Sequence, residues 1–152
     1  MIGHGVPGIN ISQSYVFSQP SSGVFLALTE GIDAWWPKTW RLAGEGSTLS
    51  LAAEIGSAML EVGPGGSAAI WGWIDALSPP SKLHLLGNFG VEGAVSGHVQ
   101  FKIEDADDGG CRLAVLHQAI GPVPEDRGAR YRSVWRDALN SRLRSYLDGG
   151  TV

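Results

Sequence analysis

One histidine stands where the sequence could support chemistry. His117 alternates with Leu113 and Val115 in a run of period two, so we expect its side chain to face the protein interior. A histidine there could orient a ligand carbonyl, or act as a general acid or base near neutral pH. The alternative is a hydrogen-bonded core histidine. His117 is the one catalytic candidate, and the sequence supplies no second group that could act with it.

Arg142 is the most unusual charged residue. In a helix of ordinary period it falls inside the apolar arc, between Ala138 and Tyr146. A buried arginine needs a partner and could clamp a carboxylate or a phosphate. In the alternative interpretation the helix end overhangs its neighbour, and the side chain extends into solvent.

Aromatic residues are the candidate wall of a ligand cavity. Strict alternation places Trp71, Trp73 and Asp75 on one face of a predicted strand, which makes Asp75 the one carboxylate near such a wall. Each buried aromatic contributes a large apolar area, and Trp or Tyr adds a polar group. The alternative is that these residues are simply core. The predicted ligand-binding residues are Trp36, Trp71, Trp73, Phe101, Val115, His117, Tyr131, Trp135 and Arg142.

Motifs for other kinds of site fail on spacing. The four histidines do not have metal-ligand spacing. Residues 105–109 suggest a calcium loop, but the glycine comes one place early and Leu116 occupies the position of the bidentate Glu. The chain has no nucleophile elbow or phosphate loop, and Cys111 has no assignable base. We therefore expect no metal and no cofactor.

A long helix near the C-terminus organises the predicted fold. Tyr131, Trp135, Leu139 and Leu143 recur at helical spacing within a predicted helix from Pro124 to Asp148. Pro124 suits a first helical turn, and the glycines at 149–150 suit the stop. So wide an apolar face requires a broad surface to pack against, and the preceding chain supplies a sheet.

The preceding chain reads as strands joined by short turns. The expected strands are residues 9–18, 48–54, 58–62, 67–77, 82–87, 97–104 and 111–119, and residues 89–95 are an uncertain glycine-rich segment. Two short helices are expected after the first strand. Short turns make consecutive strands antiparallel. We expect an α+β fold in one domain of residues 9–148, with tails at 1–8 and 149–152.

Composition excludes several classes of protein. The chain has 152 residues, 43% of them hydrophobic, and a net charge of −4, which argues against nucleic acid as a partner. Residues 1–8 lack the features of a secretory signal, and no stretch approaches the length of a transmembrane helix. The lone cysteine fits a reducing compartment. We therefore expect a cytoplasmic protein without membrane insertion.

Four stretches together resemble a known superfamily. They are Val24 to Thr29 with Trp35-Trp36-Pro37; Trp71 to Leu83; Val99 to Phe101 with Gly110 to Leu113 and His117; and Trp135 to Leu147. In this order they resemble the START-related helix-grip superfamily (SRPBCC), most closely the branch named for the activator of the heat-shock-protein-90 ATPase. The chain departs from that pattern in the third strand, where Gly56-Ser57 and Leu60-Glu61 replace a double glycine and an aromatic-Glu pair.

The resemblance implies a fold and a range of functions. It implies an antiparallel sheet of about seven strands that curves around the final helix and encloses a cavity. Members bind lipids, sterols or polyketide-like molecules; some are cyclases or hydrolases, and others bind proteins. We expect a protein that binds a small apolar or amphipathic molecule between sheet and helix. A cyclase- or hydrolase-type enzyme, or a protein-interaction module such as a co-chaperone or homodimer, is the alternative.

Overall fold

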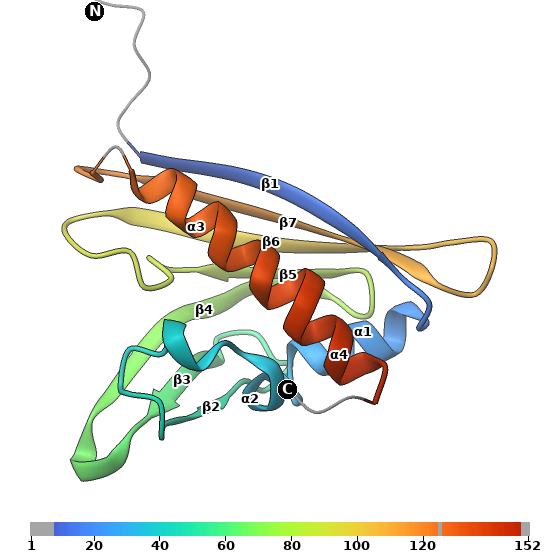
Figure 1. The fold of residues 1–152 in the computed structure, drawn as a ribbon, viewed down its shortest axis with the longest axis horizontal. Coiled ribbons are helices and arrows are strands. Elements are labelled where there is room, and N and C mark those ends of the chain that lie inside the picture. The colour runs from blue at the N-terminus through green and yellow to red at the C-terminus, as the bar shows by residue number, and fades with distance from the viewer. Residues whose placement is uncertain (1–7, 125, 150–152) are drawn as a thin grey trace, which may run out of the picture.

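A seven-stranded antiparallel sheet forms the body of the protein. The computed structural model describes residues 8–124 and 126–149. The strands, in the order β1-β7-β6-β5-β4-β3-β2 across the sheet, curve around one helical segment (Figure 1). Their bounds are β1 Gly8–Phe17, β2 Thr48–Ser50, β3 Ala58–Val62, β4 Ala68–Ser78, β5 Lys82–Leu86, β6 Ser96–Asp105 and β7 Cys111–Ile120. The predicted α+β helix-grip fold is confirmed.

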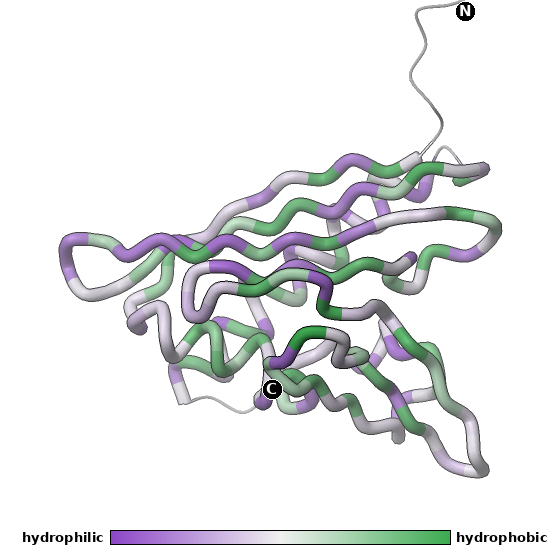
Figure 2. The backbone as a smooth tube through the Cα atoms, turned by 180° about the vertical axis from the view of Figure 1, so that it is seen from behind, coloured by the Kyte–Doolittle hydropathy of each residue, from purple (hydrophilic) through white to green (hydrophobic). Residues whose placement is uncertain are grey.

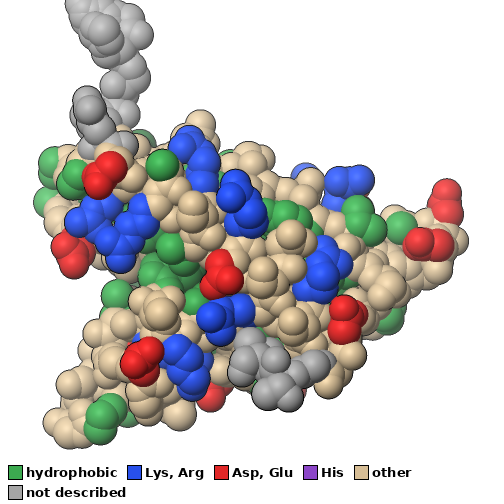
Figure 3. All heavy atoms as spheres, in the orientation of Figure 1, with side chains coloured by type: hydrophobic (Ala, Val, Ile, Leu, Met, Phe, Trp, Pro, Cys, Tyr) green, Lys and Arg blue, Asp and Glu red, His purple; other side chains and the backbone are tan. Residues whose placement is uncertain are grey.

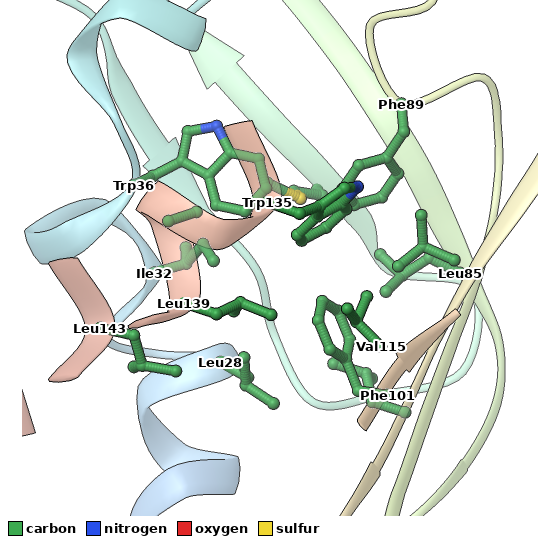
Figure 4. Packing of buried hydrophobic residues seen from close by; sticks show 14 of the residues in the cluster. Leu28, Ile32, Trp36, Leu85, Phe89, Phe101, Val115, Trp135, Leu139 and Leu143 are labelled. Carbon is green, nitrogen blue, oxygen red and sulfur yellow. The ribbon is translucent and has the colours of Figure 1, made fainter. Parts of the chain in front are cut away.

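Short helices close one end of the sheet, and a long one crosses it. The first group is α1 Ser21–Leu28, α2 Ile32–Trp35 and the 3-10 turn η1 Lys38–Trp40, and a second 3-10 turn, η2 Pro64–Gly66, joins β3 to β4. The long helix comprises α3 Arg127–Arg136, a π-helical segment Asp137–Leu143, and α4 Arg144–Leu147. Its buried residues, among them Trp135, Leu139 and Leu143, face the sheet and form the core with it (Figure 4).

The π-helical segment corrects the prediction for Arg142. A wider turn adds a residue, so the apolar stripe of ordinary helical period no longer extends through this position. Arg142 is one-third exposed and pairs through Nε with Asp137 Oδ2 at 3.0 Å, five residues earlier. Residues five apart come into line in a π-helix. Arg142 is therefore directed away from the core, in agreement with the alternative interpretation in which its side chain extends into solvent.

A β-bulge corrects the prediction for Trp73. The β3–β4 pairing passes from Met59↔Gly72 to Leu60↔Ile70, which leaves Trp71 as an extra residue in β4. The extra residue shifts the side-chain alternation by one place. Trp71 is fully buried, whereas Trp73 is 48% exposed and pairs with the exposed Leu86 on the outer face of the sheet. The two tryptophans therefore lie on opposite faces.

Most element boundaries differ from the prediction by one or two residues. Gly8, expected in the tail, is the first residue of β1, and β2 ends at Ser50 rather than residue 54. The long helix starts at Arg127, three residues later than expected. The rest of the N-terminal tail and residues 150–152 lie outside the described residues. In the part that the structure describes, no helix combines the length and apolarity needed to cross a membrane.

Candidate functional site

A cluster of aromatic rings fills the space between the sheet and α3. The closest pair, Trp36 and Trp40, stacks with ring centroids 4.8 Å apart. Trp135 from α3 contacts rings from β6, β7 and the β5–β6 loop at 5.8–5.9 Å. We call this set the aromatic cluster; its members are Trp36, Trp40, Trp71, Phe89, Phe101, His117, Tyr131 and Trp135. The predicted open space is therefore occupied by side chains.

The structure brings together seven of the nine predicted ligand-binding residues. All seven are buried: Trp36 directly after α2, Tyr131 and Trp135 on α3, and Trp71, Phe101, Val115 and His117 on the inner face of the sheet. Figure 4 labels four of them, Trp36, Phe101, Val115 and Trp135. Trp73 and Arg142 lie outside this group. The sequence interpretation missed Trp40 and Phe89. Phe89 lies in the segment with no clear pattern, where its backbone has a positive φ of 52°.

His117 is held in one tautomer by Trp135. The indole Nε1–H of Trp135 donates to His117 Nδ1 at 3.0 Å. Because an indole can only donate, His117 Nδ1 must be unprotonated, and the neutral ring carries its proton on Nε2. Burial, with a smaller contribution from the charge of His98, lowers the pKa of His117 from 6.5 to about 4. At neutral pH the residue is an uncharged hydrogen-bond donor.

Three N–H groups in the aromatic cluster lack partners. His117 Nε2, Trp36 Nε1 and Trp40 Nε1 are buried without a hydrogen bond to any residue that the structure describes. A buried donor left without a partner costs about 1–3 kcal/mol. All three groups are donors, so each of them needs an acceptor oxygen or nitrogen within the cluster.

Tyr131 lies next to two of these donor residues and lines two surface pockets. Its ring centroid lies 6.0 Å from those of both Trp40 and His117. One pocket of about 310 Å³ lies between residues 91–93, residues 122–124 and the first turn of α3. A second, of about 150 Å³, lies beside Trp40 and Arg41. Both pockets share Glu92, Arg127 and Tyr131, and we call the two together the mouth.

Basic side chains border the mouth. Arg127 and Arg130 lie beside the Tyr131 hydroxyl, and basic groups gather over the start of α3 in Figure 3. Burial raises the pKa of Tyr131, and the two arginines offset part of that effect. The hydroxyl stays protonated and donates to the Gly90 carbonyl at 3.1 Å. This bond holds the Tyr131 ring in place beside His117.

Glu61 organises the loop that carries Trp40. It is fully buried and accepts bonds from Leu42 N, Ala43 N, Ser47 Oγ and Trp71 Nε1 at 2.6–2.9 Å. Burial raises the pKa of this carboxyl, but the four donated hydrogen bonds outweigh it and the net pKa is below the ordinary value. Glu61, rather than Asp75, therefore accepts a hydrogen bond from the aromatic cluster.

Asp75 lies elsewhere, on the outer face of the sheet. A second bulge between Ile74 and Ala76 leaves it as an extra residue in β4, and it pairs with His84. Among the described residues, no group of three or more His, Cys, Asp or Glu side chains is arranged to hold a metal ion.

Comparison with solved structures shows the same fold in other proteins. A protein from Mesorhizobium loti matches with a TM-score of 0.71 and 16% identity, over 94% of this chain and 99% of that one. The Aha1 dimer from Colwellia psychrerythraea matches with a TM-score of 0.69 and 18% identity, over 95% of this chain and 99% of that one. CalU16 from Micromonospora echinospora matches with a TM-score of 0.62 and 20% identity, over 95% of this chain and 76% of that one. No family model and no curated protein matches the sequence.

Proposed function

We propose that this protein binds a small amphipathic molecule that enters at the mouth, displaces the Tyr131 ring and places an acceptor atom next to His117. The observation that carries the proposal is the unpartnered Nε2–H of His117, a donor fixed by Trp135 and fully buried. Ligand sites commonly combine an apolar wall with a few such oriented polar groups. The aromatic cluster supplies the apolar wall.

The chemistry of the donors specifies the ligand's inner end. A donor pointing into an apolar environment favours a carbonyl or ether oxygen, because such an atom accepts a bond without adding another buried donor. Trp36 Nε1 and Trp40 Nε1 present the same requirement. The inner end of the molecule is therefore a flat, largely apolar group that carries one or more acceptor oxygens.

The charges at the mouth specify the outer end. Among the described residues that line the mouth, two are arginines, Arg127 and Arg130, and one is a carboxylate, Glu92. An anionic or strongly polar outer group fits this excess of positive charge, because arginine binds carboxylates with two parallel hydrogen bonds. Entry requires Tyr131 to leave the Gly90 carbonyl, which costs a single neutral hydrogen bond.

The same geometry disfavours acid–base catalysis at His117. Its Nδ1 lone pair is used by Trp135, and its Nε2 already carries the proton. A lowered pKa, about 4, leaves the ring neutral and a poor proton donor. We therefore rank binding above a cyclase- or hydrolase-type reaction at this residue.

The test is to compare the native and denaturing mass of the protein purified from its host. We expect a small molecule that stays bound in the native spectrum and is lost on unfolding. Val123→Trp should abolish this adduct, because Val123 lines the mouth and an indole would fill it. Ile55→Trp is the matched control, since Ile55 is exposed and outside both pockets. A wild-type protein without an adduct in its native spectrum, or an adduct retained in Val123→Trp, would refute the proposal.

A further inference from the structure

A groove lies on the face of the sheet opposite the long helix. It has a volume of about 450 Å³ and is formed where β1, β6 and β7 run side by side at the end of β5; Figure 2 shows the molecule from this side. Asn10, Gln118 and His98 are paired across neighbouring strands, and Leu86 pairs with His98. These four side chains therefore form one row across the outer face, separate from the aromatic cluster.

A chain of hydrogen bonds leads along this face into the groove. Asp75 Oδ1 is hydrogen-bonded to His84 Nδ1, and His84 Nε2 is hydrogen-bonded to His98 Nδ1 at 2.7 Å. His98 Nε2 is hydrogen-bonded to Gln118 Oε1 at 2.8 Å. Gln118 Nε2 then donates to Asn10 Oδ1 at 3.3 Å. Five polar side chains, one from each of five neighbouring strands, are thus linked in a single row.

The direction of the chain follows from the chemistry of its members. An amide oxygen only accepts, so His98 donates from Nε2 to Gln118 Oε1. Gln118 Nε2 in turn donates to Asn10 Oδ1. Both bonds from His98 to Asn10 are therefore donated toward the groove. Such aligned bonds polarise one another.

The groove end of the chain consequently offers donors. The side-chain oxygens of Gln118 and Asn10 already accept bonds from within the chain, and their remaining N–H groups face outward. Among the residues that the structure describes, no acidic side chain lines the groove. Leu86 and Ile120, which are 51% and 59% exposed, form apolar walls on either side. The groove combines amide donors with an apolar surface.

We propose that this groove is a second binding site, for a small apolar molecule that carries a ketone or carboxylate oxygen. The oxygen accepts from Gln118 Nε2 and Asn10 Nδ2, while the apolar body covers Leu86 and Ile120. The site is independent of the one at His117, because the sheet lies between them and the two share no lining residue.

NMR titration of the ¹⁵N-labelled full chain tests the proposal with three naphthalene probes. Naphthoate carries a carboxylate, acetonaphthone a ketone, and naphthylmethylammonium only donors. We expect saturable shifts of the Gln118 and Asn10 side-chain amides with one or both carbonyl probes, and none with the ammonium. Comparing the first two probes decides between carboxylate and ketone. Absence of saturable shifts with both, or saturable shifts with the ammonium, would overturn the proposal.

A matched pair of variants locates the site. Gln118→Glu keeps an acceptor for His98 but removes the N–H groups and adds negative charge, so naphthoate should bind at least about tenfold more weakly. Gln100→Glu makes the same change on the same face of β6, two residues from His98 and outside the groove, and should leave affinity unchanged. Equal losses in both variants would contradict the assignment. Binding that survives Val123→Trp separates this groove from the mouth.

Discussion

His117 combines a fixed tautomer with a lowered pKa, and both result from its position in the aromatic cluster. The ring is fully buried in the aromatic cluster, where charge is unfavourable, and its Nδ1 accepts from an indole that cannot accept in return. The sequence predicted an inward-facing histidine from alternation alone. It could not predict the tautomer, because the bond to Trp135 joins residues eighteen positions apart in different elements.

The lowered pKa of His117 predicts a pH dependence of stability. The folded pKa, about 4, lies below the ordinary 6.5, so the unfolded chain binds a proton first as the pH falls. The stability is fully present above pH 6.5 and is lost as pH falls toward 4, by an amount on the order of 3 kcal/mol. Denaturant unfolding between these pH values measures it. His117→Gln should have a flatter profile, and an unchanged slope would contradict the assignment.

Glu61 predicts a second effect on stability. Glu61→Gln keeps the shape but replaces an acceptor oxygen with an NH₂ group that faces donors, so the free energy of unfolding should fall by about 2–3 kcal/mol. Glu54→Gln, at an exposed position, should change it by less than about 0.5 kcal/mol. Chemical denaturation measures both variants. Similar values for the two would show that the Glu61 carboxylate is not needed to hold the loop.

Periodicity predicted most elements, and two local insertions account for the wrong assignments among the site residues. The strands from β3 to β7 and the long helix were predicted to within about three residues, because burial on one face imposes alternation or helical spacing. The bulge at Trp71 and the π-helical segment at Asp137–Leu143 each add one residue to a regular pattern. Neither insertion has a signature in the polar–apolar pattern, and each moved one predicted residue, Trp73 or Arg142, away from the site.

The bulge in β4 makes a prediction at the level of the strand. Trp71→Ala should lower the unfolding free energy by about 3–5 kcal/mol, because the ring is buried and bonded to Glu61. Trp73→Ala should lower it by about 1 kcal/mol or less, since that side chain is half exposed on the outer face. Thermal and urea unfolding of both variants tests this. Equal losses would mean that the two rings share the inner face after all.

The whole molecule uses the two faces of one sheet differently. The inner face and the long helix enclose the aromatic cluster, which opens toward solvent at the mouth, while the outer face carries a hydrogen-bond chain that ends in a groove. The sequence predicted the enclosed side, because large apolar residues mark it. The outer chain was not predicted, since Asp75, His84 and His98 come together through strand register and a bulge rather than through spacing along the chain.

A long-range ¹H–¹⁵N NMR spectrum at about pH 7 reports the protonation and tautomer of each histidine ring. We predict that His117 is neutral with its proton on Nε2. We also predict that the Nε2 signal moves when the molecule identified by native mass spectrometry is added to ligand-free protein. A proton on Nδ1, a charged ring, or an Nε2 signal that does not respond to that molecule would contradict the proposed function.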